Sequence, residues 1–102
     1  MPEREMRNDK VEALLSVLSQ ISDADAIYDL FCDLLTVREI EDAAGRLEVA
    51  RLLDAGKSYM QIQKETGASA TTVSRVSKCL NYGTGGYRRA LDVLAADETA
   101  GR

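Results

Sequence analysis

The fold of this chain is decided by residues 57–80, KSYMQIQKETGASATTVSRVSKCL. They predict two short helices joined by a tight turn that begins at Gly67. Ser58 and Gln61 form a capping box at the start of the first helix, because the hydroxyl can accept a free backbone N–H and the amide can reach back. Gly67 suits the left-handed residue that ends a helix, and Ser69 caps the second helix almost at once. Such a sharp turn is typical of a helix-turn-helix.

The second of these helices has an apolar face and a polar face. Val73, Val76 and Leu80 recur at helical spacing, which predicts that they pack inward. The other side carries small hydroxyl and basic side chains: Thr71, Thr72, Ser74, Arg75 and Lys78. Hydroxyls can bind bases or phosphates, and arginine can donate two hydrogen bonds to guanine. The pattern predicts a helix that enters the DNA major groove; the alternative is a capped hairpin whose polar face is only solvated.

We predict two kinds of DNA contact in this segment. Base contacts are expected at the start of the second helix, from Ala70, Thr71 and Thr72. Phosphate contacts and positioning are expected from Ser58, Tyr59, Lys64, Ser69, Arg75 and Lys78. Further along, Arg88 and Arg89 can reach the DNA backbone as well.

Charge is distributed unevenly along the chain. The region from Lys57 to Arg89 has six basic residues against one acidic residue, Glu65. Its formal charge is +5 and that of the remainder −9, which together give the −4 of the whole chain. A basic reading surface on an acidic body attracts phosphate locally and limits non-specific binding, provided that the basic residues share a face.

Composition argues against an enzyme and against a metal site. The chain of 102 residues is long enough for one small domain, and it contains no histidine, the usual general base and commonest metal ligand. Cys32 and Cys79 lie in apolar helical contexts, which predicts buried structural thiols. No catalytic residue, metal or cofactor is therefore expected. The absence of a signal peptide and of a run of about 18 apolar residues favours a cytoplasmic protein without a membrane partner.

The rest of the chain is also predicted to be helical, which gives an all-α fold of about six helices in one domain, residues 1–102. Two helices with apolar stripes follow Asn8 or Asp9 and Asp23. Thr36 and Glu39 form a capping box at the start of the longest helix, which is expected to run to about Asp54. This helix is predicted to bury Ile40, Ala43, Ala44, Leu47, Ala50 and Leu53, with Val49 and Leu52 widening its apolar sector. A loop over residues 81–86 and a helix over about 87–96 follow.

The helices over about 9–55 offer more apolar surface than a two-helix DNA-binding unit needs. We predict that this surface forms the interface of a homodimer. Two-fold symmetry would place two recognition helices one DNA turn apart, about 34 Å, on a near-palindromic site. The alternative is a closed monomeric bundle. The expected partners are therefore double-stranded DNA and a second copy of the chain.

Several of these stretches together resemble the Trp repressor family. They are residues 35–39 (LTVRE), 44–46 (AGR), 52–56 (LLDAG) and the turn 65–69 (ETGAS). The endings 73–83 (VSRVSKCLNYG) and 85–87 (GGY) are most similar to the YerC/YecD branch of that family. The similarity extends over residues 35–87 and is weak before them. It implies six helices, an intertwined homodimer, and transcriptional regulation by binding in the major groove.

The resemblance also implies an effector pocket. In the repressor, two arginines and a helix-opening threonine help to form the tryptophan pocket, and the matching residues here are Arg46, Arg75 and Thr36. The repressor has a glycine after the second arginine, whereas Val76 follows it here and would project into the space of the indole. The implied effector is a small carboxylate other than tryptophan, or none. From the residues alone, Arg46 can instead pair with Asp42, and Arg75 can contact phosphate.

These observations predict a sequence-specific, homodimeric DNA-binding regulator of the repressor type. The alternative from another class is a helical dimeric protein-interaction module without specific DNA binding.

Overall fold

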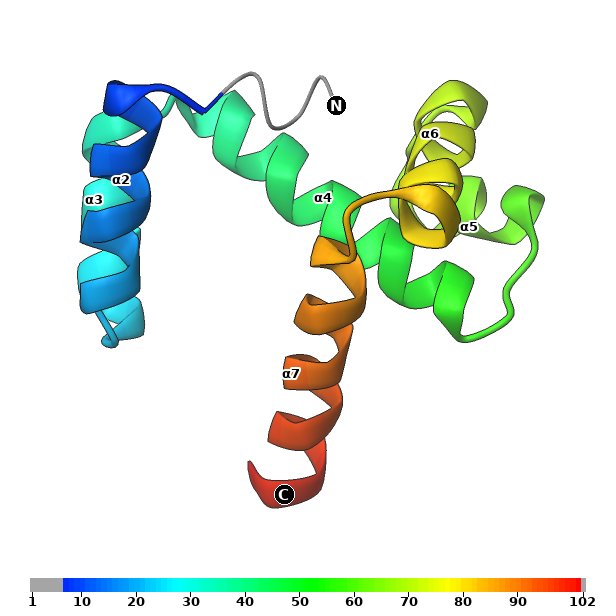
Figure 1. The fold of residues 1–102 in the computed structure, drawn as a ribbon. Coiled ribbons are helices and arrows are strands. Elements are labelled where there is room, and N and C mark those ends of the chain that lie inside the picture. The colour runs from blue at the N-terminus through cyan, green and yellow to red at the C-terminus, as the bar shows by residue number, and fades with distance from the viewer. Residues whose placement is uncertain (1–6, 102) are drawn as a thin grey trace. The chain divides into compact units, whose positions relative to one another are not determined.

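The computed structural model describes residues 7–101, with side chains up to residue 98. This part of the chain contains six helices and no strand, which confirms the all-α prediction (Figure 1). The helices are α2 (Asp9–Gln20), α3 (Ala24–Leu34), α4 (Val37–Asp54), α5 (Tyr59–Thr66), α6 (Ala70–Tyr82) and α7 (Gly86–Gly101). The chain divides into two compact units between Ile40 and Glu41, a point inside α4. Within the described residues, no helix is long and apolar enough to cross a membrane.

The helices of the first unit begin at the residues that the sequence indicates. The Asn8 side chain accepts a hydrogen bond from the Val11 N–H at 3.0 Å and caps α2. At α4 the predicted capping box is complete, because the Glu39 N–H donates to Thr36 Oγ1 at 3.1 Å and the Thr36 N–H donates to Glu39 Oε1 at 2.8 Å. The hydrogen bond from the Thr36 backbone, helped by its hydroxyl, lowers the pKa of the Glu39 carboxyl below its ordinary value.

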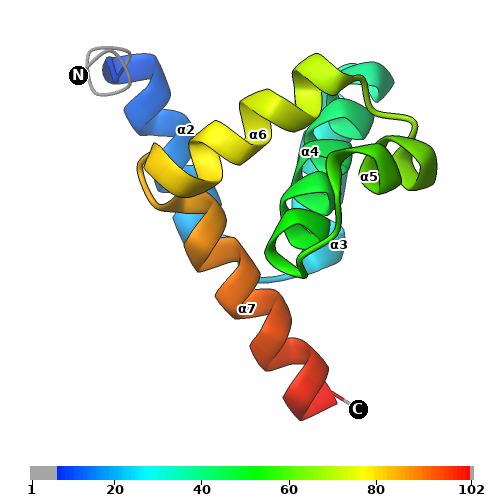
Figure 2. The ribbon, with the colours of Figure 1, turned by 90° about the vertical axis from the view of Figure 1, so that its right-hand side faces the viewer.

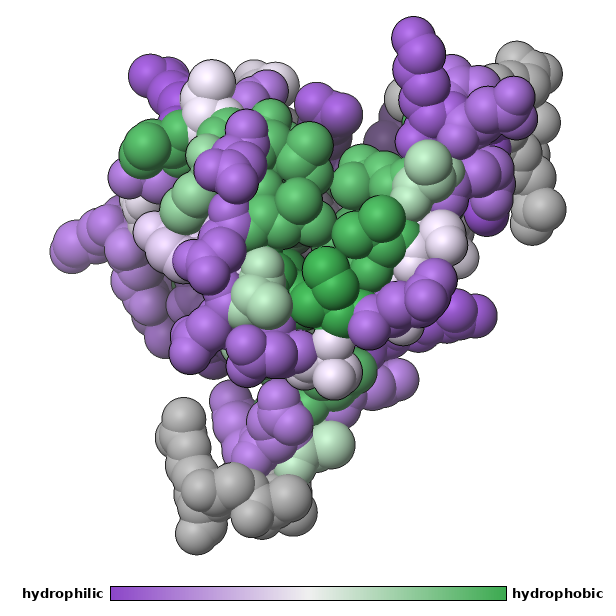
Figure 3. All heavy atoms as spheres, turned by 90° about the vertical axis from the view of Figure 1, so that its left-hand side faces the viewer, coloured by the Kyte–Doolittle hydropathy of each residue, from purple (hydrophilic) through white to green (hydrophobic). Residues whose placement is uncertain are grey.

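The first two helices have apolar stripes but no buried residue. Leu14 and Leu15 are each 40% exposed, and Tyr28 and Leu34 are more exposed still. Figure 3, turned so that the left-hand side of Figure 1 faces the viewer, shows hydrophobic side chains gathered at the surface. The prediction that Cys32 is buried is wrong: it lies on α3 outside the stripe of that helix and is exposed.

The core of the second unit is built from four helices. Its buried side chains are Val49, Ala50, Leu52, Ile62, Val73, Val76, Leu80 and Leu91. The predicted inward face of α6 is therefore confirmed. On α4 the prediction was wrong for Ala43 and Ala44, which are exposed, whereas Ala50 is buried as predicted and Val49 and Leu52 are buried in the widened apolar sector. Only the second half of α4 contributes to this core. A prediction that treats the apolar positions of the whole helix alike therefore includes residues of its first half that are not buried.

The connection between α6 and α7 is shorter than predicted. Asn81 and Tyr82 continue α6, the loop is reduced to residues 83–85, and α7 extends beyond its expected end. The Gly83 N–H donates to the Cys79 carbonyl at 2.9 Å and closes α6. A Cβ atom at Gly83 would collide with that same carbonyl oxygen, so only glycine fits this close approach.

Candidate nucleic-acid interface

The turn between α5 and α6 has the predicted local chemistry. Ser58 Oγ accepts the Gln61 N–H at 3.1 Å, which provides the serine half of the capping box at α5. Gly67 ends α5 in the left-handed region at φ 76°, and its N–H donates to the Gln63 carbonyl at 2.9 Å. Ser69 Oγ then accepts the Thr72 N–H at 3.1 Å and caps α6. Figure 2 shows α6 following α5 across this turn and leading to α7.

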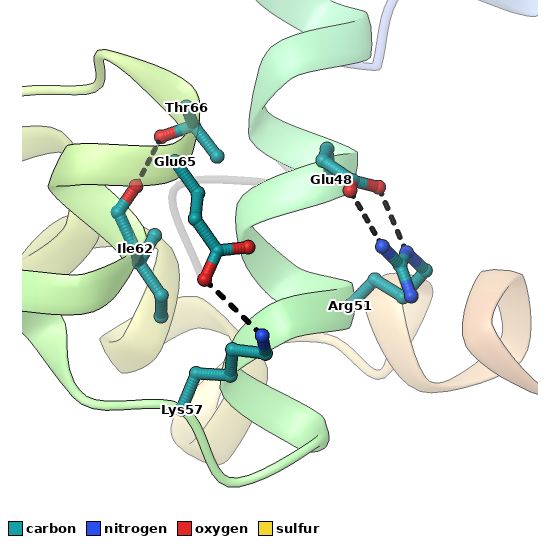
Figure 4. A network of polar contacts seen from close by, with 6 residues as sticks. All are labelled: Glu48, Arg51, Lys57, Ile62, Glu65 and Thr66. Carbon is teal, nitrogen blue, oxygen red and sulfur yellow. Dashed lines mark hydrogen bonds and ion pairs between the residues drawn. The ribbon is translucent and has the colours of Figure 1, made fainter.

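Two further contacts hold the turn in place, and neither was predicted from the sequence. The Thr66 hydroxyl donates to the Ile62 carbonyl at 2.7 Å and accepts the Ala68 N–H at 3.1 Å, so one side chain joins the end of α5 to the turn. Lys57 Nζ lies 3.1 Å from Glu65 Oε2 and links the start of the segment to the end of α5 (Figure 4). The Thr66 contact could have been predicted, because a threonine in the last turn of a helix commonly donates its hydroxyl to the carbonyl four residues back.

The outer face of α6 forms an open groove of about 530 Å³. The groove is lined by Ala70, Thr71, Ser74, Arg75 and Lys78, all of them exposed. Four of these residues were predicted DNA contacts. Ser74 was not, although its position three residues after Thr71 places it on the same face. The groove combines hydroxyl groups with two cations, which are the groups that bind base edges and phosphates.

The other predicted DNA contacts lie outside this groove. Tyr59 and Lys64 are exposed on α5. Ser69 donates its hydroxyl proton to Thr72 Oγ1 at 3.0 Å, so its proton is already used within the cap. Thr72 is half-buried and lines a second cavity instead of the groove. Arg88, suggested as a backbone contact, forms an ion pair with Asp54.

The second cavity has a volume of about 230 Å³ and lies among α4, α6 and α7. It is lined by Arg46, Thr72, Arg75, Val76, Cys79 and Tyr87. The two arginines of the predicted effector pocket therefore face one space, while Thr36 belongs to the first compact unit. Cys79 was predicted to be buried, which is wrong: the helical stripe that buries Val76 leaves it exposed.

Tyr87 is the cavity residue whose acidity is changed by its surroundings. Burial, and then the neighbouring Cys79, raise the pKa of the Tyr87 phenol, whereas the guanidinium groups of Arg46 and Arg75 act in the opposite direction. Within the described residues Arg46 has no ion pair with Asp42. In the same part of the chain, no group of three or more acidic or cysteine side chains could hold a metal ion.

Comparison with known proteins gives one consistent result. The family model described as Trp repressor protein matches residues 9–95. An uncharacterized protein, YerC, from Bacillus subtilis (strain 168) is 44% identical over 94 residues, which cover 92% of this chain and 90% of YerC. The crystal structure of a TrpR-like protein from Eubacterium eligens has a TM-score of 0.84 at 38% identity, covering 90% of this chain and 95% of that one. A putative Trp repressor from Staphylococcus aureus has a TM-score of 0.86 at 33% identity, covering 93% and 95% respectively.

Proposed function

The chain belongs to the Trp repressor family, and we propose that it is a sequence-specific DNA-binding regulator of transcription that acts as a homodimer. The observation that carries this proposal is the outer face of α6, where Ala70, Thr71, Ser74, Arg75 and Lys78 line one open groove. A capped helix start with small side chains allows close approach to base edges, while the cations beyond it suit phosphates.

The residues of α6 are proposed to contact bases or phosphates according to their position along the helix. Ala70 and Thr71 occupy its first turn, where recognition helices contact bases, and Ser74 continues that surface one turn later. Arg75 and Lys78 lie further along the same groove and would hold the DNA backbone. Tyr59 and Lys64 would add positioning contacts from α5. Thr72 is better suited to supporting the start of α6, because its N–H and hydroxyl are both bonded to Ser69.

The homodimer is supported by the unburied stripes of α2 and α3. A helix pair with exposed Leu14, Leu15, Val17, Tyr28 and Leu34 and no buried residue lacks a core of its own. Apolar surface of this kind needs a partner, and a second copy would also supply the symmetry of a two-half-site operator. A single domain over residues 1–102, with dimerisation helices at about 9–55, remains our prediction for the assembled protein.

Selection from a random duplex library tests the function directly. The purified protein is mixed with the library at physiological salt, and the bound pool is sequenced. We expect enrichment of a two-fold symmetric motif whose half-sites are one turn apart, about 34 Å. Binding to all duplexes alike, with a Kd of ~10⁻⁴–10⁻⁶ M, would instead favour the protein-interaction module.

Thr71→Ala sharpens this test, with Gln61→Ala on α5 as a control outside the groove. The Thr71 variant should lose discrimination at one or two base pairs, by ~1–3 kcal/mol where a direct base contact is removed. The control should select the same motif as the unaltered protein. If the Thr71 variant also selects that motif unchanged, Thr71 does not read bases.

A further inference from the structure

Thr66 joins α5 to the turn before α6 through a single hydroxyl group. Its Oγ1 donates to the Ile62 carbonyl at 2.7 Å and accepts the Ala68 N–H at 3.1 Å. Ile62 is fully buried, so one end of this bridge is anchored in the core of the second unit. The other end lies in the turn, one residue before Ser69, the cap of α6. Figure 4 shows the Thr66 hydroxyl pointing toward the Ile62 carbonyl.

The bridge replaces a backbone hydrogen bond that the turn lacks. In a Schellman motif, two successive N–H groups after a helix donate to carbonyls of its last turn. At the end of α5 only the first of them does so, since the Gly67 N–H donates to the Gln63 carbonyl at 2.9 Å. In the part of the chain that the structure describes, no backbone carbonyl accepts the Ala68 N–H. Ala68 is half-buried against the core, so removal of the Thr66 hydroxyl would leave its N–H without a protein acceptor.

The neighbouring ion pair cannot take over this role. Lys57 Nζ and Glu65 Oε2 lie 3.1 Å apart, but their side chains are 35% and 39% exposed. An exposed pair is screened by salt and contributes little to holding a geometry. The pair also joins a residue before α5 to the end of α5, and it does not include the residues between α5 and α6. Among side chains, the Thr66 hydroxyl is therefore the contact that ties the turn to α5.

Base contacts and phosphate contacts differ in how accurately α6 must be placed. Ala70 and Thr71 have short side chains, and such contacts require a geometry held to within about 0.5 Å. Lys78 has a flexible four-carbon stem, which can follow a phosphate after a small displacement of the helix. A displaced start of α6 should therefore impair the reading of bases more than the holding of the backbone.

We propose that Thr66 is a specificity-determining positioning residue, whose hydroxyl fixes the start of α6 relative to α5 and thereby allows Ala70 and Thr71 to read bases. Thr66 itself lies outside the groove and touches no DNA in this proposal. The inference rests on the proposed function, since it needs a protein that distinguishes DNA sequences. Loss of the hydroxyl should lower sequence discrimination and spare the phosphate contacts that all duplexes share.

The test compares two substitutions of Thr66 in the full chain. Thr66→Val keeps the shape of the side chain and removes the hydroxyl, whereas Thr66→Ser keeps the hydroxyl. Thr84→Val is the matched control, because Thr84 is exposed and has no hydrogen bond within the described residues. The Kd is measured for the duplex enriched by library selection and for an unrelated duplex, over a range of salt concentrations and well below Tm. Hydrogen exchange of the Ala68 amide is followed by NMR without DNA. If Thr66→Val does not fold, Thr66→Ala removes the same hydroxyl with a better helix former.

We expect Thr66→Val to raise the Kd of the selected duplex about tenfold, an effect of the size of one mismatched base pair. The Kd of the unrelated duplex and the slope of its salt dependence should not change, because the phosphate contacts remain. The Ala68 amide should exchange faster in Thr66→Val and stay protected in Thr66→Ser. Thr66→Ser should restore the discrimination between the two duplexes, and Thr84→Val should match the unaltered protein.

Three results would overturn the proposal. Equal weakening on both duplexes would show that Thr66 only stabilises the fold. An unchanged ratio of the two Kd values would show that its hydroxyl does not position α6. A serine variant that behaves like the valine variant would show that the hydroxyl is not the group that matters.

Failure of the proposed function has a different signature. An unaltered protein that enriches no motif and binds both duplexes alike would discard the regulator and the positioning role together. Faster exchange of the Ala68 amide in Thr66→Val would in that case keep the hydroxyl bridge as a contact of the fold alone.

Discussion

At the scale of single residues, Lys78 and Thr71 lie in one groove but are expected to have different effects on DNA binding. A phosphate contact carries no sequence information, so Lys78→Ala should weaken binding to every duplex alike. It should also reduce the slope of log K against log salt by about one counterion per subunit. A salt titration of the affinity for two unrelated duplexes measures both effects. Lys10→Ala, an exposed lysine on α2, is the charge-matched control and should leave the slope unchanged. A loss confined to one sequence would show that Lys78 reads bases.

Tyr87 provides a pH-dependent test of the cavity. Its phenol has a pKa above the ordinary value of about 10, because burial in the cavity disfavours the phenolate. The folded state therefore binds this proton more tightly than the unfolded state does. The resulting stabilisation is complete below pH 10 and is lost as the pH rises through the folded pKa. Denaturant unfolding from pH 8 to 11.5 should show a steeper loss of stability in the unaltered protein than in Tyr87→Phe. Parallel curves would mean that Tyr87 is not desolvated.

At the scale of elements, two glycines with opposite surroundings test how the helices are built. Gly83 ends α6 where a Cβ atom would strike the Cys79 carbonyl, so Gly83→Ala should destabilise the fold by ~1–3 kcal/mol. Gly45 lies inside α4 with open space around its Cβ position, so Gly45→Ala should stabilise the fold by up to ~1 kcal/mol. The free energy of unfolding from urea titrations measures both changes. Destabilisation by Gly45→Ala would indicate that another surface packs closely against this position.

The same elements show what the sequence could predict. Caps are local, since Ser58, Thr36 and Ser69 each bond a backbone N–H three residues away, and all three were predicted. Burial on α4 depends on which neighbours cover the helix, which periodicity alone does not contain, so Ala43 was misassigned. The groove residues could be predicted because they all lie on one face of α6. The position of Thr72 in the cavity could not, because the other walls of the cavity come from α4 and α7.

At the scale of the whole molecule, the two compact units differ in how much apolar surface they bury. Among the residues whose side chains are described, the second unit has a core of eight buried hydrophobic residues. In the first unit, α2 and α3 bury none, although both carry leucines at helical spacing. A helix pair without a core is marginal in water, because its conformational entropy is not offset by burial. The stability of the first unit should therefore depend on association with a second chain.

This dependence can be measured through concentration. If α2 and α3 form the dimer interface, Tm should rise with protein concentration, and light scattering should give twice the mass of one chain. Leu15→Glu places a charge on the unburied stripe of α2 and should yield a monomer with a lower Tm that no longer depends on concentration. Met60→Glu is the control: Met60 is 81% exposed on α5, outside the proposed interface, and its substitution should leave the mass unchanged. The Leu15 variant should also lose cooperative binding to the two-half-site operator, because each monomer then binds one half-site alone. If Leu15→Glu remains a dimer while Met60→Glu dissociates, the interface lies on the second unit and the role assigned to α2 and α3 is wrong.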